Sequence, residues 1–326
     1  MRHFISRREF ILAIGTAAVS TSSSSKAALA GEFKSPFRVA VINDEITQDF
    51  ERACEIASRE FGMQWIEIRG MWRKNIVNLD ANEISEAKRI LDKYSLRVTD
   101  IASPLFKTDW PGAPKSKFSP KKPEFGANFS GSQQDALLEH CIDLAKTFQT
   151  ERIRCFDFWR LDDPAPYREE INEKLRQAAE RVGRSGLILV LENELDCNTA
   201  TGAEAAKTLQ EVETSHLMLN WDPGNAAARG ERPYPDGYDL LPKNRIGHCH
   251  CKDVVKRANG EGFTWAAMGT GLIDWVGQFK ALKKDGYHYA VSLETHWRGA
   301  GTPEASTRQS WSGMKKDLEE AGALQA

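Results

Sequence analysis

The sequence predicts an α/β protein that folds as one single-domain (β/α)8 (TIM) barrel, and two observations support this prediction. Eight short, β-rich apolar segments alternate with amphipathic helical segments along most of the 326-residue chain. The expected strands are almost continuously apolar, as is typical of parallel strands that are covered on both faces. A closed barrel of this kind has eight strand–helix units and typically about 250 residues. The sequence has the eight units, and its greater length leaves room for a modest insertion.

The expected strands are runs of six or seven residues rich in valine, isoleucine and leucine. They are FRVAVI (37–42), QWIEIR (64–69), LRVTDIA (96–102), RIRCFDF (152–158), LILVLE (187–192), HLMLNW (216–221), RIGHCH (245–250) and YAVSLE (289–294). A doubly wound open sheet is the rival fold. It usually has a glycine-rich phosphate loop after its first strand, and this sequence has none there.

The expected helices repeat apolar residues every three or four positions, and several end in glycine, which suits a helix C-terminus. They cover residues 48–62, 82–95, 134–149, 172–186, 201–213, 272–286 and 310–322, with a weaker helical segment at 232–243. The long segment 107–133 follows the third strand and is rich in proline, glycine, lysine and aromatic residues. A loop of this length is usually a lid or a binding loop, and the alternative is a disordered excursion.

The first 30 residues have the layout of an export signal. The pair Arg7-Arg8 precedes an apolar run over 11–19, and Ala28-Leu29-Ala30 forms a small-residue cleavage pattern. The apolar run is shorter than the roughly 20 residues that span a membrane. The paired arginines resemble the bacterial twin-arginine signal, which implies export of the folded protein to the periplasm by the twin-arginine translocase. We therefore expect a signal peptide at 1–30, a barrel at 31–326, and no stable membrane insertion after cleavage.

Composition excludes some classes of function. The formal net charge is −2, so no basic footprint indicates a nucleic-acid partner. The six cysteines have no zinc-finger spacing, and a chain of this length does not need a disulfide scaffold, so we expect mostly buried free thiols. An oligomer remains open.

Four residues that suit a metal ion lie at the ends of the last four expected strands: Glu192, Asp222, His250 and Glu294. Each alone has an ordinary explanation, such as a solvated carboxylate or a turn-forming aspartate. Together they fall at the end of the barrel where active sites form, so we expect them to share one divalent metal. Three carboxylates and one imidazole suit Mn²⁺, our first expectation, and also Mg²⁺, Co²⁺ or Zn²⁺.

The segment GHCHCKD (247–253) raises the question of which face meets the metal. Side chains alternate along a strand, so His248, His250 and Lys252 share one face and the two cysteines share the other. We expect His250 to be the ligand, His248 to support it by a hydrogen bond, and Lys252 to contact substrate. Cys249 and Cys251 then face the helices as small buried side chains.

The sequence resembles the sugar phosphate isomerase/epimerase family of xylose-isomerase-like TIM barrels over most of its length. The matching motifs are IEIRG (66–70), RCFDFWR (154–160), LENE (191–194), LNWDPGN (219–225), HCHCKD (248–253), GTGLIDW (269–275) and SLETH (292–296). The resemblance implies the metal ligands Glu192, Asp222, His250 and Glu294, with the two glutamates as the catalytic acid/base pair. Two positions depart from the ketose 3-epimerases of this family: Asn225 replaces a substrate-contacting histidine, and Lys256 replaces an arginine.

The expected reaction is isomerisation or epimerisation of a carbohydrate, in which a glutamate removes a proton next to a carbonyl and an enediolate forms. A 3-keto-glycoside lyase or hydratase would use the same metal and glutamate base. A metal-dependent sugar-binding protein without turnover is a third hypothesis. A DNA-repair endonuclease of the same superfamily is disfavoured, because its extra histidine ligands are absent. Further candidate substrate contacts are Glu67, Arg69 and Arg298.

Overall fold

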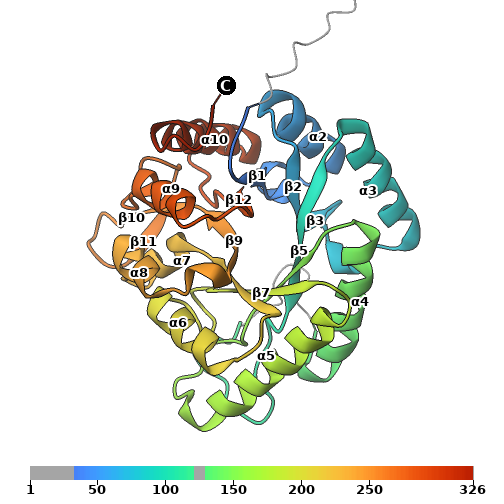
Figure 1. Cartoon of the computed structure of the whole chain (residues 1–326), viewed down its shortest axis with the longest axis vertical. Coiled ribbons are helices and arrows are strands. Elements are labelled where there is room, and N and C mark those ends of the chain that lie inside the picture. Colours follow the sequence, from blue (N-terminus) through green and yellow to red (C-terminus); the bar gives the residue numbers. More distant parts are fainter. Residues whose placement is uncertain (1–32, 121–128, 326) are drawn as a thin grey trace, which may run out of the picture.

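The computed structural model describes residues 33–120 and 129–325 (Figure 1). The expected signal peptide at 1–30 lies outside the described residues, as do residues 121–128 of the expected lid. In the described part of that loop, the ring of Trp110 packs edge-on against Phe158 at 4.7 Å, beside the end of a barrel strand. The lid function stays a prediction.

Eight parallel strands form one sheet in the order β1-β12-β9-β8-β7-β6-β5-β2. The strands are β1 (Arg38–Val41), β2 (Trp65–Ile68), β5 (Arg97–Leu105), β6 (Arg152–Cys155), β7 (Ile188–Glu192), β8 (Leu217–Trp221), β9 (Ile246–Cys251) and β12 (Ala290–Leu293). A parallel bridge between Ile42 and Glu67 joins the two outer strands and brings the sheet round on itself. Each strand falls within or overlaps an expected one, so the predicted barrel is confirmed.

Helices surround the strands on the outside of the barrel (Figure 1). They are α2 (Phe50–Glu55), α3 (Ala81–Tyr94), α4 (Gln134–Thr147), α5 (Arg168–Gly183), α6 (Gly202–Glu211), α8 (Tyr238–Leu240), α9 (Trp275–Lys284) and α10 (Pro303–Glu320). Capping boxes begin α3 at Asp80 and α6 at Thr201. In each box, the first residue and a glutamate three positions later accept hydrogen bonds from each other's backbone N–H groups. The expected helix 48–62 continues beyond α2 as a π-helix, and α10 begins earlier than expected, at Pro303.

Short elements that the periodicity did not predict follow several barrel strands. They are α1 (Asn43–Ile46), α7 (Pro223–Ala228) and the hairpins β3 (Gly70–Met71) with β4 (Lys74–Asn75) and β10 (Asp253–Lys256) with β11 (Phe263–Ala266). Elements of two to six residues are too short to show a helical or strand period. They follow β1, β8, β2 and β9, and therefore surround the C-terminal end of the barrel.

Polar side chains occupy positions inside the barrel that branched apolar residues usually fill. Glu67, Asp100, Asn220 and His248 are all fully buried. Buried polar groups are costly unless they are paired, and Glu67 accepts a hydrogen bond from His248 Nε2 at 3.0 Å. Burial, together with the neighbouring charge of Glu67, raises the pKa of Asp100 to about 6. The interior is therefore polar below the C-terminal mouth.

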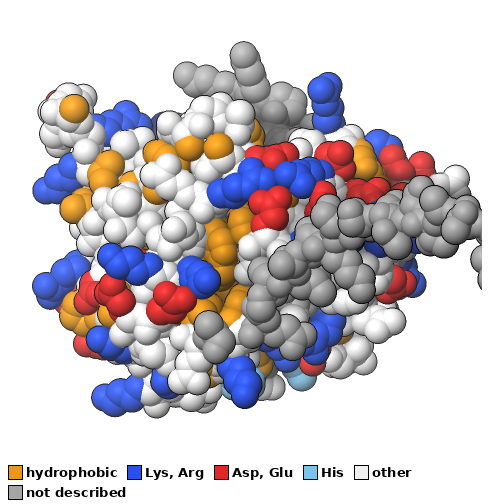
Figure 2. All heavy atoms as spheres, turned by 90° about the horizontal axis from the view of Figure 1, so that it is seen from above, with side chains coloured by type: hydrophobic (Ala, Val, Ile, Leu, Met, Phe, Trp, Pro, Cys, Tyr) orange, Lys and Arg blue, Asp and Glu red, His pale blue; other side chains and the backbone are white. Residues whose placement is uncertain are grey.

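The outer surface carries intermixed charges. On the face shown in Figure 2, basic side chains lie among acidic ones and do not gather into one patch. Arg308 on α10 illustrates this pattern, since it pairs with Glu60 at 2.8 Å and with Glu304 at 3.2 Å. Among the described helices, none is both long enough and apolar enough to span a membrane.

Asp317 on α10 makes stability depend on pH. Burial, together with the charges of Asp253 and Glu320, raises the pKa of its carboxyl to about 6. As pH rises, the unfolded chain therefore releases this proton at a lower pH than the folded chain does. The free energy of unfolding is unaffected below a pH of about 4 and decreases as the pH rises through about 6. Asp317→Asn should stabilise the protein at pH 8 by up to about 3 kcal/mol, and hardly at pH 4. Urea unfolding at both pH values measures this, and equal effects at the two would contradict it.

Candidate active site and metal centre

Four buried side chains meet at the C-terminal mouth of the barrel. Glu192 ends β7, Asp222 follows β8, His250 lies in β9, and Glu294 follows β12. One ligand atom from each of these residues lies within 4.8 Å of the others. None of the four is more than 2% exposed. The structure thus brings together the four residues that the sequence placed in one metal site.

The orientation of His250 decides whether this cluster fits a cation. Its Nε2 lies 3.0 Å from Glu67 Oε1, which accepts the Nε2 proton. Its Nδ1 faces three carboxylate oxygens, at 3.6 Å from Glu192, 3.6 Å from Asp222 and 3.2 Å from Glu294. With three anionic oxygens around it, Nδ1 needs either a proton of its own or a cation among those oxygens. A divalent metal meets this need, and the oxygen-rich donor set suits it.

Cationic side chains surround the same carboxylates. Lys252 Nζ lies 2.7 Å from both Asp222 Oδ2 and Glu294 Oε2. Arg154 Nη1 lies 3.1 Å from Glu192 Oε2, and Arg69 Nη1 lies 2.6 Å from Glu294 Oε1. Charge pairs this close favour the ionised forms of both partners. The carboxylates are therefore held as anions, the state in which they ligate metal or remove a proton.

These contacts shift the pKa values of the two glutamates. Burial alone would raise the pKa of Glu192, but the charges of His250 and Arg154 outweigh it and lower the pKa to about 2. Burial opposes ionisation of Glu294 as well, and Lys252, His296 and His250 together hold its pKa well below the usual range. Both carboxylates are thus ionised at neutral pH.

Glu67 and His248 form a second layer beneath the cluster. Glu67 accepts hydrogen bonds from His248 Nε2 and His250 Nε2, each at 3.0 Å. Glu67 is fully buried with one oxygen on each histidine, and the substrate contact expected from the sequence stays a prediction. The carboxylate holds the ring of His250 in place, a common arrangement around protein metals. His248 supports the site through Glu67.

Replacing Glu67 with glutamine should weaken metal binding and leave the fold intact. A glutamine amide has one acceptor and one donor end, so it cannot accept protons from both histidines. Loss of such a partner typically costs about 10- to 100-fold in metal affinity. A chelator-competition titration measures the change, with Glu55→Gln on the outer helix α2 as the control. Equal affinity in Glu67→Gln and the wild-type protein would show that His250 does not depend on Glu67.

The remaining predicted contacts divide into two groups. Asn225 Nδ2 reaches Glu192 Oε1 and Glu194 Oε2, both at 3.2 Å, and so lies at the cluster. Arg69 contacts Glu294, as described above, and also Glu45 at 2.7 Å. Arg298 is half-exposed and pairs with Glu45 at 2.8 Å, at the rim. Lys256 lies exposed on the hairpin strand β10 and is not brought to the cluster.

Comparison with known proteins agrees with the barrel fold. The profile of the family described as xylose isomerase-like TIM barrel matches residues 56–317. The chain belongs to this family. No curated protein shows a significant match to the sequence.

Solved structures with the same fold include three whose descriptions bear on the site. The probable 3-DHS dehydratase AsbF of Bacillus anthracis is 18% identical, with 84% of this chain and 97% of that chain covered and a TM-score of 0.64. A xylose isomerase-like TIM barrel protein from Mycobacterium smegmatis, in complex with magnesium, is 18% identical, with 88% and 98% covered and a TM-score of 0.62. A D-psicose 3-epimerase with D-tagatose from Clostridium cellulolyticum H10 is 15% identical, with 88% and 98% covered and a TM-score of 0.60.

Sequence reasoning missed Arg154 at the mouth, and it did not predict the carboxylate partners of Lys252. Arg154 donates to Glu192 and, through Nη2, to the carbonyl of Ala102 at 3.1 Å. Its alternation with Arg152 in RIRCF was a usable signal, because two arginines on one face of a buried strand must both find partners. Lys252 reaches its partners only because residue 224 is glycine: a Cβ there would lie 2.4 Å from Lys252 Cγ. The spacing of residues in the sequence reveals neither that Arg154 pairs with Glu192 nor that Gly224 leaves space for Lys252.

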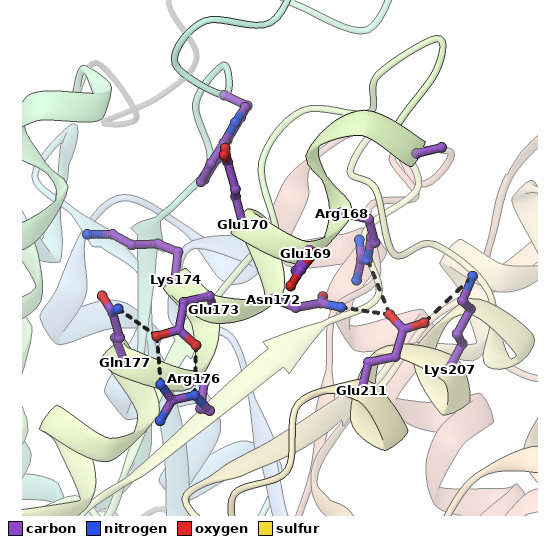
Figure 3. A pocket seen from close by; sticks show the side chains of 12 residues that line it. Arg168, Glu169, Glu170, Asn172, Glu173, Lys174, Arg176, Gln177, Lys207 and Glu211 are labelled. Carbon is purple, nitrogen blue, oxygen red and sulfur yellow. Dashed lines mark hydrogen bonds and ion pairs between the residues drawn. The ribbon is translucent and has the colours of Figure 1, made fainter.

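A large cavity of about 1070 Å³ lies elsewhere, against α5 and α6 on the outside of the barrel (Figure 3). Its lining is charged and largely paired: Arg176 contacts Glu173 at 2.6 Å, and Asn172 donates to Glu211 at 2.7 Å. None of the four metal-competent residues lines it. It is a charged groove between helices, separate from the candidate metal centre.

Proposed function

We propose that this protein is a divalent-metal-dependent carbohydrate isomerase or epimerase that removes and returns a proton next to a carbonyl. The observation that carries the proposal is the buried cluster of Glu192, Asp222, His250 and Glu294, whose ligand atoms lie within 4.8 Å of one another at the barrel mouth. A bound divalent cation would polarise the carbonyl oxygen and acidify the neighbouring C–H group. Mn²⁺ is the metal we propose.

The two glutamates are suited to act on opposite faces of a substrate. In the sheet order, β12 and β7 are separated by β9 and β8, so Glu294 and Glu192 come from the two outer strands of the four. Arg69 and Lys252 orient Glu294, while Arg154 and Asn225 orient Glu192. One glutamate removes a proton, and the other returns one to the opposite face of the same carbon, which inverts it. Return to the neighbouring carbon gives isomerisation instead.

A lyase is the second candidate, because the surroundings of the two glutamates are unequal. Each oxygen of Glu294 faces a cationic side chain, at 2.6 Å from Arg69 and 2.7 Å from Lys252. Glu192 has one charged arginine partner, and its other oxygen accepts from the neutral amide of Asn225. Elimination needs only one abstracting base, and Glu192 is the less neutralised of the two. Among proteins of this fold, AsbF is described as a dehydratase and another as an epimerase.

Export to the periplasm belongs to the proposal as well. The pair Arg7-Arg8, the apolar run and the Ala28-Leu29-Ala30 pattern occur in the order that a twin-arginine signal requires. The test is fractionation of bacterial cells that express the full chain. Replacement of both Arg7 and Arg8 with lysine should retain the protein in the cytoplasm, whereas unchanged export would refute the twin-arginine route.

The experiment that tests the reaction is incubation of the metal-loaded protein with ketoses, aldoses and 3-keto-glycosides in D₂O. NMR then shows whether deuterium enters one carbon next to the carbonyl. Exchange together with inversion or carbonyl migration supports the isomerase or epimerase, and exchange together with loss of a substituent supports the lyase. Metal-dependent binding without any exchange, across the panel, would favour a sugar-binding protein.

A further inference from the structure

A cavity of about 470 Å³ opens beside the candidate metal centre. Five of its nine lining residues are apolar, namely Leu195, Ala228, Val254, Phe263 and Trp265, and the others are Arg257, Glu261, Gly262 and Thr264. Each wall follows a strand of the centre: Leu195 lies three residues after Glu192, Ala228 ends the helix that Asp222 caps, and Val254 follows β9. The volume lies within the range of roughly 300–1,000 Å³ that small-molecule sites occupy.

Trp265 connects this cavity to the carboxylate cluster. Its ring lies 5.1 Å from Lys252 Nζ, which itself contacts Asp222 and Glu294. Its other ring neighbour is His296, at 5.3 Å between centroids. A group held in the cavity against Trp265 would therefore be adjacent to a group held at the metal centre.

The hairpin of β10 and β11 fixes the aromatic wall. Phe263 and Trp265 are two residues apart on β11, so they share one face of that strand. Val254 pairs with Trp265 across the hairpin, and Lys256 pairs with Phe263. Arg257 closes the turn, because its Nε donates to the carbonyl of Phe263 at 2.9 Å. The half-buried rings of Phe263 and Trp265 are thus presented to the cavity on a paired support.

We propose that this cavity is a subsite for a second, uncharged ring that is joined by a glycosidic bond to the sugar held at the metal centre. This inference rests on the proposed function and deepens it, since it makes the substrate a glycoside and not a free monosaccharide. An apolar wall with two aromatic rings stabilises the apolar face of a sugar or an aromatic ring by burial and ring contact. The charged residues of the lining, Arg257 and Glu261, lie on the exposed turn of the hairpin.

Calorimetric titration of the metal-loaded protein tests the subsite without requiring turnover. The probes are methyl glucoside, phenyl glucoside and a glucose disaccharide. We expect the phenyl glycoside or the disaccharide to bind about 10-fold more tightly than the methyl glycoside, a difference that burial of one ring against tryptophan can supply. Which of these two ligands binds more tightly shows whether the subsite prefers an aromatic ring or a second sugar ring.

Trp265→Ala should remove this difference, and Trp265→Phe should retain most of it. Val255→Ala is the matched control, because Val255 lies in the same hairpin, does not line the cavity and should leave the difference unchanged. Elemental analysis verifies that each variant keeps its metal.

Equal affinities for all three glycosides in the wild-type protein would overturn the subsite. So would a Trp265→Ala variant that loses the same factor for the methyl glycoside as for the larger ligands, since Trp265 would then only shape the metal centre. A ring-dependent affinity that disappears in Trp265→Ala supports the subsite even if no ligand exchanges a proton. That result, with no exchange in the D₂O experiment, would refute the isomerase and lyase and leave the subsite standing.

Discussion

Alanine at His250 or Asp222 should abolish tight binding of a divalent cation. His250 supplies the Nδ1 atom that faces three carboxylates, and Asp222 supplies one of those oxygens. A metal that binds only the folded chain stabilises it by about 4 kcal/mol when its concentration is 1,000 times its dissociation constant. Both variants should lose this increment. Elemental analysis after dialysis and thermal unfolding with and without Mn²⁺ measure the two effects.

Cys251→Ala is the matched control for this experiment. Cys251 is next to His250 on β9 but its side chain belongs to the apolar core outside the barrel sheet. The variant should keep its metal and lose only packing, by at most a few kcal/mol. Full metal occupancy in His250→Ala and Asp222→Ala would disprove the ligand set, and loss of metal from Cys251→Ala would mean that the cysteine face meets the centre.

The barrel could be predicted because each of its strands carries a local signal. The alternation of GHCHCKD assigned His250 and the cysteines to opposite faces, and the structure has Cys249 and Cys251 in the outer core. The strand ends then placed Glu192, Asp222 and Glu294 at one mouth, since parallel strands have their C-termini together. None of this requires knowledge of contacts between distant residues.

The surroundings of the cluster depend on such contacts, and the sequence left them undetermined. Glu67 sits in IEIR, where the pattern did not distinguish a residue at the mouth from one a layer below. The β10–β11 hairpin has no helical or extended period long enough to detect, so Trp265 was not expected at the mouth. Arg69 was expected there, but its contact with Glu294 spans 225 residues and follows only from closure of the barrel.

Glutamine at Glu192 or Glu294 should lower turnover on the true substrate by about 10²- to 10⁴-fold, the usual contribution of a positioned acid or base. Glutamine keeps the volume and one ligand oxygen but cannot accept the proton. Each variant should therefore keep its fold and much of its metal. Steady-state kinetics together with elemental analysis separate lost chemistry from lost metal. Glu151→Gln is the control, because Glu151 is mostly exposed and precedes β6 at the opposite end of the barrel.

The two variants also distinguish the candidate reactions. In an epimerase, one of them should still exchange the substrate hydrogen with D₂O without completing inversion, because the surviving glutamate can still remove and return a proton on its own face. In a lyase, Glu192→Gln should lose far more activity than Glu294→Gln, since Arg69 and Lys252 already neutralise Glu294. Near-wild-type turnover in both would refute the two-glutamate mechanism. The base would then have to be a neighbouring group, and Lys252, His248 and His296 are the residues to replace next.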